Sequence, residues 1–132
     1  MQTTNTTTPE DLLSTYFARC NGGELEATTS LYEDTGVLVA QPAMAAEGTA
    51  AVREALAQFF MMRPRLAIEA SRIIVAGDIA LALTRWTLDG AGPDGPVRMT
   101  GTATDVLRRQ PDGRWRVAID NPWGIGALEM AS

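Results

Sequence analysis

The feature that most constrains the fold is a change of hydrophobic pattern at Pro64. Before this residue, apolar side chains recur every three or four positions, which is typical of amphipathic helices. After it, strand-like runs are separated by turn signals. Because the hairpin-like joins follow one another, they favour an antiparallel meander, and helices followed by strands predict an α+β domain. The predicted strands cover residues 65–75, 79–88, 97–109 and 114–121, joined at 76–78, 89–96 and 111–113.

Three helices are expected before Pro64. The first has Thr8 as its N-cap and Pro9 at its first position, because a hydroxyl side chain followed by proline is a common helix start. It ends at Asn21-Gly22-Gly23. The other expected elements are a short second helix at 24–32, a short strand at 37–39, a loop at 43–48 and a third helix at 49–61.

The length and composition limit the classes of function. The chain has 132 residues, enough for a single domain at 9–132 behind a flexible tail at 1–8. It has no lysine and a net charge of −5, which disfavours nucleic acid because phosphate binding needs clustered cations. No apolar run approaches a membrane span. A single cysteine and the lack of a signal peptide favour the cytoplasm. The absence of histidine excludes Ser-His-Asp and Cys-His catalysis.

The predicted strand at 97–109 carries a carboxylate on its apolar face. Alternation places Asp105 in phase with Met99, Gly101, Ala103 and Leu107. A carboxylate that faces the core loses solvation, so its pKa should rise unless a donor or a cation compensates. One interpretation is a neutral acid that donates a hydrogen bond to a ligand. The other is a structural acceptor for a neighbouring backbone group or arginine, or a strand whose phase slips at a bulge.

Tyr16 lies in the middle of the apolar stripe of the first helix, between Leu13 and Cys20. An aromatic residue at such a position is commonly part of the core. Its hydroxyl still needs a partner once it is buried, and a buried acid is the obvious candidate. Both Tyr16 and Asp105 are therefore candidate functional residues.

Four segments resemble the nuclear transport factor 2-like superfamily, and within it the SnoaL-like and ketosteroid isomerase-like branches. They begin at Tyr16, Leu31, Gly48 and Asp105, and read YFARCNGGELE, LYED, GTAAVREA and DVLRRQPDGRWRV. The resemblance covers about residues 9–125. It implies a cone-shaped α+β domain in which three N-terminal helices pack on a strongly curved, mainly antiparallel sheet.

The resemblance also implies roles for particular residues. In the ketosteroid isomerases, a tyrosine of the first helix and a protonated aspartate of the sheet form an oxyanion hole. Tyr16 and Asp105 match these two positions, so both are expected to be catalytic if the protein is an enzyme. The general-base aspartate of those enzymes is replaced here by Gln41, a neutral amide that cannot abstract a proton. The expected ligand-binding residues are Gln41, Phe59, Met62, Trp86, Met99, Asn121 and Trp123.

The directions in which the side chains of the last predicted strand and of Arg85 point allow alternatives. Simple alternation puts Asn121 inward with Trp115 and Val117, and Asp120 on the opposite face in a surface or inter-subunit ion pair. Trp123 is expected either to wall the pocket or to cap the core. Arg85 either points inward to neutralise a carboxylate or lies where its strand leaves the core.

Two functions are expected from different classes. The first is a small-molecule pocket protein for an apolar or carbonyl-bearing ligand, with isomerase-, cyclase- or hydratase-like polarisation of a carbonyl or enolate by Tyr16 and Asp105. The second is a non-catalytic ligand-binding or homodimerisation module, because the threonine-rich face of the third strand suits a flat interface between two copies. No metal, nucleotide or other cofactor is expected.

Overall fold

The structure of the chain is a computed structural model that describes residues 6–129. Its elements follow the order α1 (Pro9–Asn21), α2 (Leu25–Thr29), β1 (Tyr32–Gln41), β2 (Met44–Glu47), α3 (Thr49–Phe60), β3 (Arg65–Ala76), β4 (Ile79–Gly92), β5 (Gly95–Arg109), β6 (Trp115–Asp120) and a final 3₁₀ helix, η1 (Gly124–Glu129). No helix in this described stretch is long and apolar enough to cross a membrane.

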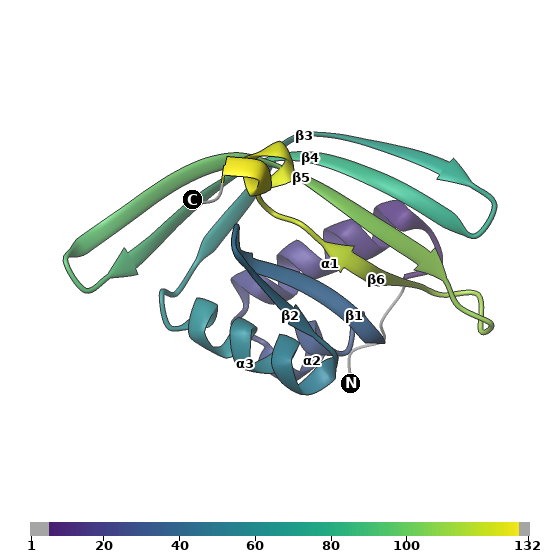
Figure 1. Cartoon of the computed structure of the whole chain (residues 1–132), viewed down its shortest axis with the longest axis horizontal. Helices are drawn as coiled ribbons and strands as arrows, with labels where there is room; N and C mark the ends of the chain where they lie inside the picture. The colour runs from purple at the N-terminus through teal and green to yellow at the C-terminus, as the bar shows by residue number, and fades with distance from the viewer. Residues whose placement is uncertain (1–5, 130–132) are drawn as a thin grey trace.

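The strands form one six-stranded sheet in the order β2-β1-β6-β5-β4-β3. Only β1 and β6 run parallel, and all other neighbours are antiparallel. Figure 1 shows β3, β4 and β5 as an arch, with α1, α2 and α3 on the side toward which the arch bends. The predicted α+β class and the curved, mainly antiparallel sheet are therefore confirmed.

The first half of the chain differs from the prediction in its order. The third helix follows two strands, so only α1 and α2 are N-terminal to the sheet. The segment predicted as a loop at 43–48 contains β2, which pairs with β1 through Val37–Glu47 and Leu38–Ala46. Its residues include no β-branched side chain, and therefore the strand forms through pairing with β1 and not through its own propensity.

The glycine- and proline-rich break at 89–96 is mostly strand. β4 continues to Gly92 and β5 begins at Gly95, so the two strands form one long ribbon. The positive φ of Gly95, 118°, permits the tight turn at its tip. Figure 1 shows this ribbon extending well beyond the helices.

The hydrophobic core lies between the helices and the concave face of the sheet. α1 contributes Leu12, α3 contributes Val52 and Leu56, and the sheet contributes Leu107 and Val117. The predicted N-cap is confirmed, because the Thr8 hydroxyl accepts a hydrogen bond from the Asp11 N–H at 3.0 Å. Such a cap contributes about 1 kcal/mol to helix stability.

The predicted flexible tail at 1–8 lies partly outside the described residues. Within its described part, Thr6 is buried and its carbonyl accepts a hydrogen bond from the Trp115 N–H at 2.7 Å, whereas Thr7 and Thr8 are exposed. This bond ties Thr6 to the first residue of β6.

The convex face of the sheet carries an apolar row that crosses four strands. Strand register aligns Ile74 of β3, Leu81 of β4, Val106 of β5 and Ile119 of β6. Ile74, Leu81 and Ile119 are 39–47% exposed. We call these four residues the outer row. In a single chain they leave contiguous apolar surface in contact with water.

Candidate functional site

A β-bulge in β6 decides which side chains face the interior. Val106 pairs with Ile119, but the next paired residues are Leu107 and Val117, so Ala118 is an extra residue on β6. A bulge of one residue reverses the alternation beyond it. Asp120 therefore points inward and is only 7% exposed. The faces predicted for Asp120 and Asn121 were wrong, because the prediction assumed unbroken alternation.

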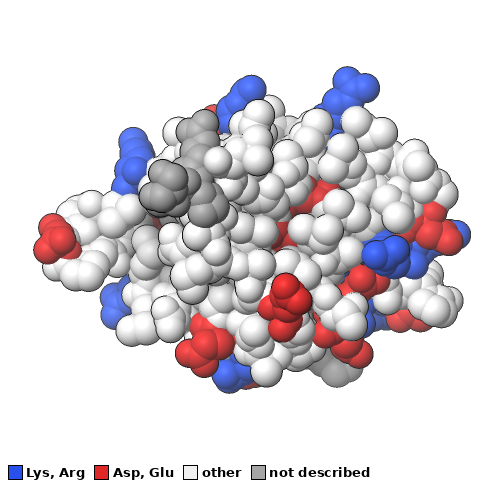
Figure 2. All heavy atoms as spheres, viewed as in Figure 1, with Lys and Arg blue, Asp and Glu red and all other residues white. Residues whose placement is uncertain are grey.

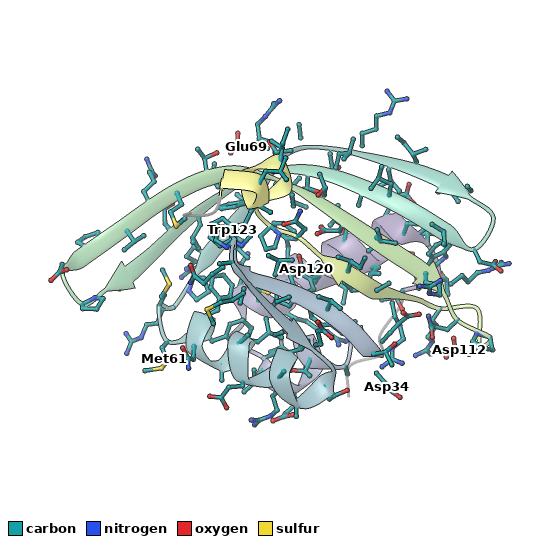
Figure 3. All side chains as sticks on the ribbon, viewed as in Figure 1. Asp34, Met61, Glu69, Asp112, Asp120 and Trp123 are labelled. Carbon is teal, nitrogen blue, oxygen red and sulfur yellow. The ribbon has the colours of Figure 1, made fainter. Side chains whose placement is uncertain are left out.

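Asp120 is the centre of a buried hydrogen-bond network. Its Oδ2 accepts a hydrogen bond from the Tyr32 hydroxyl at 2.5 Å and contacts the Tyr16 hydroxyl at 3.0 Å. The two hydroxyl oxygens lie 2.7 Å apart. α1, β1 and β6 each supply one of these residues, so the network joins the helix layer to the sheet. Figure 3 shows Asp120 beneath the arch, whereas Asp34, Met61 and Asp112 lie at the periphery.

The hydroxyl oxygens of Tyr16 and Tyr32 and the Oδ2 of Asp120 form a triangle of three contacts. Only the two phenolic protons are shared among these contacts. Each hydroxyl has one proton to donate, so only two of the three contacts are hydrogen bonds at any moment. The two shorter contacts correspond to donation from Tyr16 to Tyr32 and from Tyr32 to Asp120. In this arrangement Tyr16 lies at the outer end of the relay, and its proton can turn to another acceptor without leaving Asp120 unpaired.

Asp105 completes the network on the neighbouring strand. It faces inward as predicted and is 9% exposed. Continuing the β5–β6 register by one step from Val106–Ile119 places Asp105 directly opposite Asp120. Two like charges in such a cross-strand pair are unfavourable. Asp105 and Asp120 share a hydrogen bond that a protonated carboxyl supplies, and the Asp105 Oδ1 also accepts the Asn121 N–H at 2.8 Å.

Burial is the main reason why the pKa of Asp105 lies well above its ordinary value of 3.8, and the charge of Asp120 raises it further. The Asn121 N–H opposes the shift, because it stabilises the charged form. Burial and the Asp120 charge also raise the pKa of the Tyr16, Tyr32 and Cys20 side chains. The raised pKa values favour the neutral forms of the Asp105 carboxyl, the two phenols and the thiol.

The predicted functional pair is brought into one network, although not by a direct bond. Tyr16 contacts Asp120 and Tyr32, and Asp105 reaches them through Asp120. Sequence reasoning missed Tyr32, because the segment 24–32 was predicted to be helical. The observation that could have identified it is the single aromatic residue in Leu31-Tyr32-Glu33, where β1 begins.

Four of the predicted ligand-binding residues lie in one apolar cluster at the other end of the concave face. Trp86 is buried with Leu88 and Ala103, and the partly buried Phe59, Met62 and Met99 pack against this group together with Phe17 and Leu66. Gly101 makes room for the Trp86 ring, because a Cβ at this position would lie 2.7 Å from the ring. We call this group the Trp86 cluster.

The other predicted residues have different places. Gln41 is exposed at the end of β1. The Asn121 amide donates to the Thr104 hydroxyl at 3.0 Å and to the Gly124 carbonyl at 3.1 Å, and Thr104 belongs to the convex face. Trp123 donates from Nε1 to the Val39 carbonyl at 2.8 Å, which ties the C-terminal segment to β1. Arg85 is exposed on the convex face, so the alternative of an inward Arg85 was wrong.

The predicted apolar pocket does not stand out as an open cavity. The two hollows that stand out most on the surface of the described residues lie around Gln110 and Pro111, at the turn between β5 and β6. Neither is lined by Tyr16, Asp105 or Asp120. In the view of Figure 2, charged side chains lie mainly at the margins of the molecule, and most of the surface between them is uncharged. Among the described residues, no group of three metal-ligating side chains is present.

Comparison with protein families gives a match over most of the chain. The model of the SnoaL-like domain matches residues 13–118. The chain belongs to the SnoaL-like family. This SnoaL-like chain matches none of the curated proteins searched.

Solved structures with a similar fold include a nuclear transport factor 2-like protein and a kinase association domain. An NTF2-like protein with a cystatin-like fold from Novosphingobium aromaticivorans is 18% identical, with a TM-score of 0.71 over 83% of this chain and 75% of that one. A putative calcium/calmodulin-dependent protein kinase II association domain from Xanthomonas campestris is 18% identical, with a TM-score of 0.74 over 83% and 80%.

A third solved structure contains a bound small molecule. It is a protein from Catenulispora acidiphila in complex with S-DNPA, which is 20% identical, with a TM-score of 0.71 over 84% of this chain and 86% of that one. At this level of identity, the likeness to the SnoaL-like chain concerns the fold alone.

Proposed function

We propose that the protein binds a small, mainly apolar molecule that carries a carbonyl or enol oxygen, and that the network of Tyr16, Tyr32, Asp105 and Asp120 polarises this oxygen. The observation that carries the proposal is the buried pair of Asp105 and Asp120 on the concave face, joined to two phenols. The burial of two carboxyl groups costs free energy, and buried acids with a shifted pKa are common at functional sites. The bound S-DNPA of the Catenulispora acidiphila protein is consistent with small-molecule binding in this fold.

The chemistry follows from the protons of the network. An incoming oxygen can accept the Tyr16 proton, while Tyr32 continues to donate to Asp120 or turns toward Tyr16. Neutral donors in a site of low dielectric stabilise negative charge that develops on a carbonyl oxygen. Asp120 can accept a proton through Tyr32 and Tyr16, which Gln41 cannot do. This arrangement suits isomerase-, cyclase- or hydratase-like reactions, each of which passes through an enol or enolate.

The test is the binding of 2-naphthol, a flat apolar phenol, followed by its fluorescence. The wild-type protein is expected to bind it, and Tyr16→Phe to weaken binding about 2- to 13-fold, which corresponds to one hydrogen bond of about 0.5–1.5 kcal/mol. Asp105→Leu is expected to weaken binding to a similar extent. The control is Asp94→Asn, an exposed change at the tip of the β4–β5 ribbon. The absence of binding to the wild-type protein, or equal binding by Tyr16→Phe, would contradict the proposal.

A second function, assembly as a homodimer, is favoured by the outer row. Large exposed side chains at Ile74, Leu81 and Ile119 on the convex face of the sheet are typical of an interface between two copies. Such a module could also act without catalysis. We expect Leu81→Arg to lower the molar mass measured by light scattering from that of a dimer to that of a monomer. Gln58→Arg, on the exposed side of α3, should leave the mass unchanged, and a monomeric wild-type protein would rule out this function.

A further inference from the structure

Thr84 has a buried hydroxyl that the network does not use. The residue lies on β4, faces inward and is completely buried. Among the described residues, its Oγ1 finds no hydrogen-bond partner. A buried hydroxyl without a partner destabilises the folded state, and native proteins contain few of them. Thr84 therefore needs an explanation that core packing does not give.

The position of Thr84 is between the two parts of the candidate site. Its partner on β5 is Ala103, a member of the Trp86 cluster, and the next inward residue of β5 is Asp105. Diagonal neighbours on one face of an antiparallel pair lie about 7–8 Å apart. On the same face, its neighbours along β4 are Ala82 and Trp86, and Ala103 lies opposite on β5. Thr84 thus lies between a carboxyl on one side and the aromatic cluster on the other.

We propose that the Thr84 hydroxyl is a second polar contact for the ligand and selects molecules with two oxygen functions. This inference rests on the proposed function. One oxygen of the ligand meets the Tyr16–Asp105 end of the site, and a second hydroxyl or carbonyl oxygen, further along the same flat apolar skeleton, bonds with Thr84. The Trp86 cluster contacts the carbon skeleton. The site therefore takes flat apolar compounds with two oxygen functions in preference to compounds with a single oxygen.

The test compares 2-naphthol with 1,3-, 2,6- and 2,7-dihydroxynaphthalene, which share one skeleton and differ in the position of the second oxygen. At least one diol is expected to bind the wild-type protein 3- to 10-fold more tightly than 2-naphthol. Thr84→Val removes the hydroxyl at nearly constant volume, and should abolish this advantage, so that the variant binds the diols no more tightly than it binds 2-naphthol. Thr84→Ser, which keeps a hydroxyl, should retain most of it.

The outcomes separate this inference from the proposed function. Binding of 2-naphthol without any advantage for a diol, or an advantage that Thr84→Val retains, overturns only the role of Thr84. Failure of all four compounds to bind overturns both.

Thermal unfolding without ligand gives a second measurement. Thr84→Val should raise the melting temperature by a few degrees, because an unpaired hydroxyl is lost. Thr28→Val should lower it, since the buried Thr28 hydroxyl donates to the Glu24 carbonyl at 2.7 Å. A similar fall for both variants would show that the Thr84 hydroxyl already has a partner, and would contradict the inference.

Discussion

Replacement of Asp120 by alanine is expected to destabilise the protein by about 2–4 kcal/mol, because hydrogen bonds to charged groups contribute about 1.5–3 kcal/mol each. The variant loses the acceptor of the Tyr32 hydroxyl and the contact with Tyr16, and it leaves the Asp105 carboxyl without its partner. Removal of a buried polar group offsets part of this loss, because the burial of a carboxyl group costs desolvation free energy. Urea unfolding at pH 7, compared with the wild-type protein, measures the change.

Two matched variants separate the causes of this effect. Asp120→Asn keeps an acceptor at the same place and should cost clearly less than Asp120→Ala. Tyr32→Phe removes the 2.5 Å hydrogen bond to Asp120 and the contact with the Tyr16 hydroxyl but keeps the carboxyl, and should fall between the two. A loss below about 0.5 kcal/mol for Asp120→Ala is the size typical of surface substitutions, and would mean that Asp120 is not the centre of a buried network.

The second large effect is the pH dependence of stability caused by Asp105. Burial and the Asp120 charge raise the pKa of Asp105 in the folded protein above its ordinary value of 3.8. The folded state therefore binds the proton more tightly, so this stabilisation is complete below pH 3.8 and is lost as the pH rises through the folded-state pKa. Asp105→Asn imitates the neutral acid and has no such loss. Its stability relative to the wild-type protein should increase by about 1.4 kcal/mol for each pH unit within that window.

The measurement is urea unfolding of both proteins from pH 4 to pH 9. Asp94→Asn is the control, because it makes the same substitution at an exposed position at the tip of the β4–β5 ribbon. A constant difference between Asp105→Asn and the wild-type protein would mean that Asp105 has the same pKa in the folded and unfolded states, and the interpretation of Asp105 as a neutral acid would be wrong.

The features that the sequence predicted correctly depend on local pattern. Asp105 was placed inward because the alternation of β5 continues unbroken from Val97 to Leu107, and strand alternation is a local property of the backbone. The start of α1 was identified because Thr8 and Pro9 form a cap that needs no tertiary contact. The Trp86 cluster was foreseen in part, since Phe59 and Met62 continue the apolar side of α3 and its end.

The features that were missed depend on pairing between distant segments. The bulge at Ala118 exists only relative to β5, and it exchanges the faces of Asp120 and Asn121. β2 is likewise a strand only because β1 pairs with it. Tyr32 joins the network because the parallel β1–β6 pairing aligns it with Val117. No local pattern in the sequence specifies these registers, so the charged centre of the site could not be predicted.

The measurement that tests the central claim most directly is the carboxyl-carbon NMR titration of Asp105, assigned with Asp105→Asn. The account predicts a pKa well above 3.8 in the wild-type protein, and a lower pKa in Asp120→Asn, because the Asp120 charge and its hydrogen bond to Asp105 both raise it. A wild-type pKa near 3.8 or below would mean a solvated or ion-paired carboxylate. The polarising network would then be excluded, and the homodimer module would be the better account of the protein.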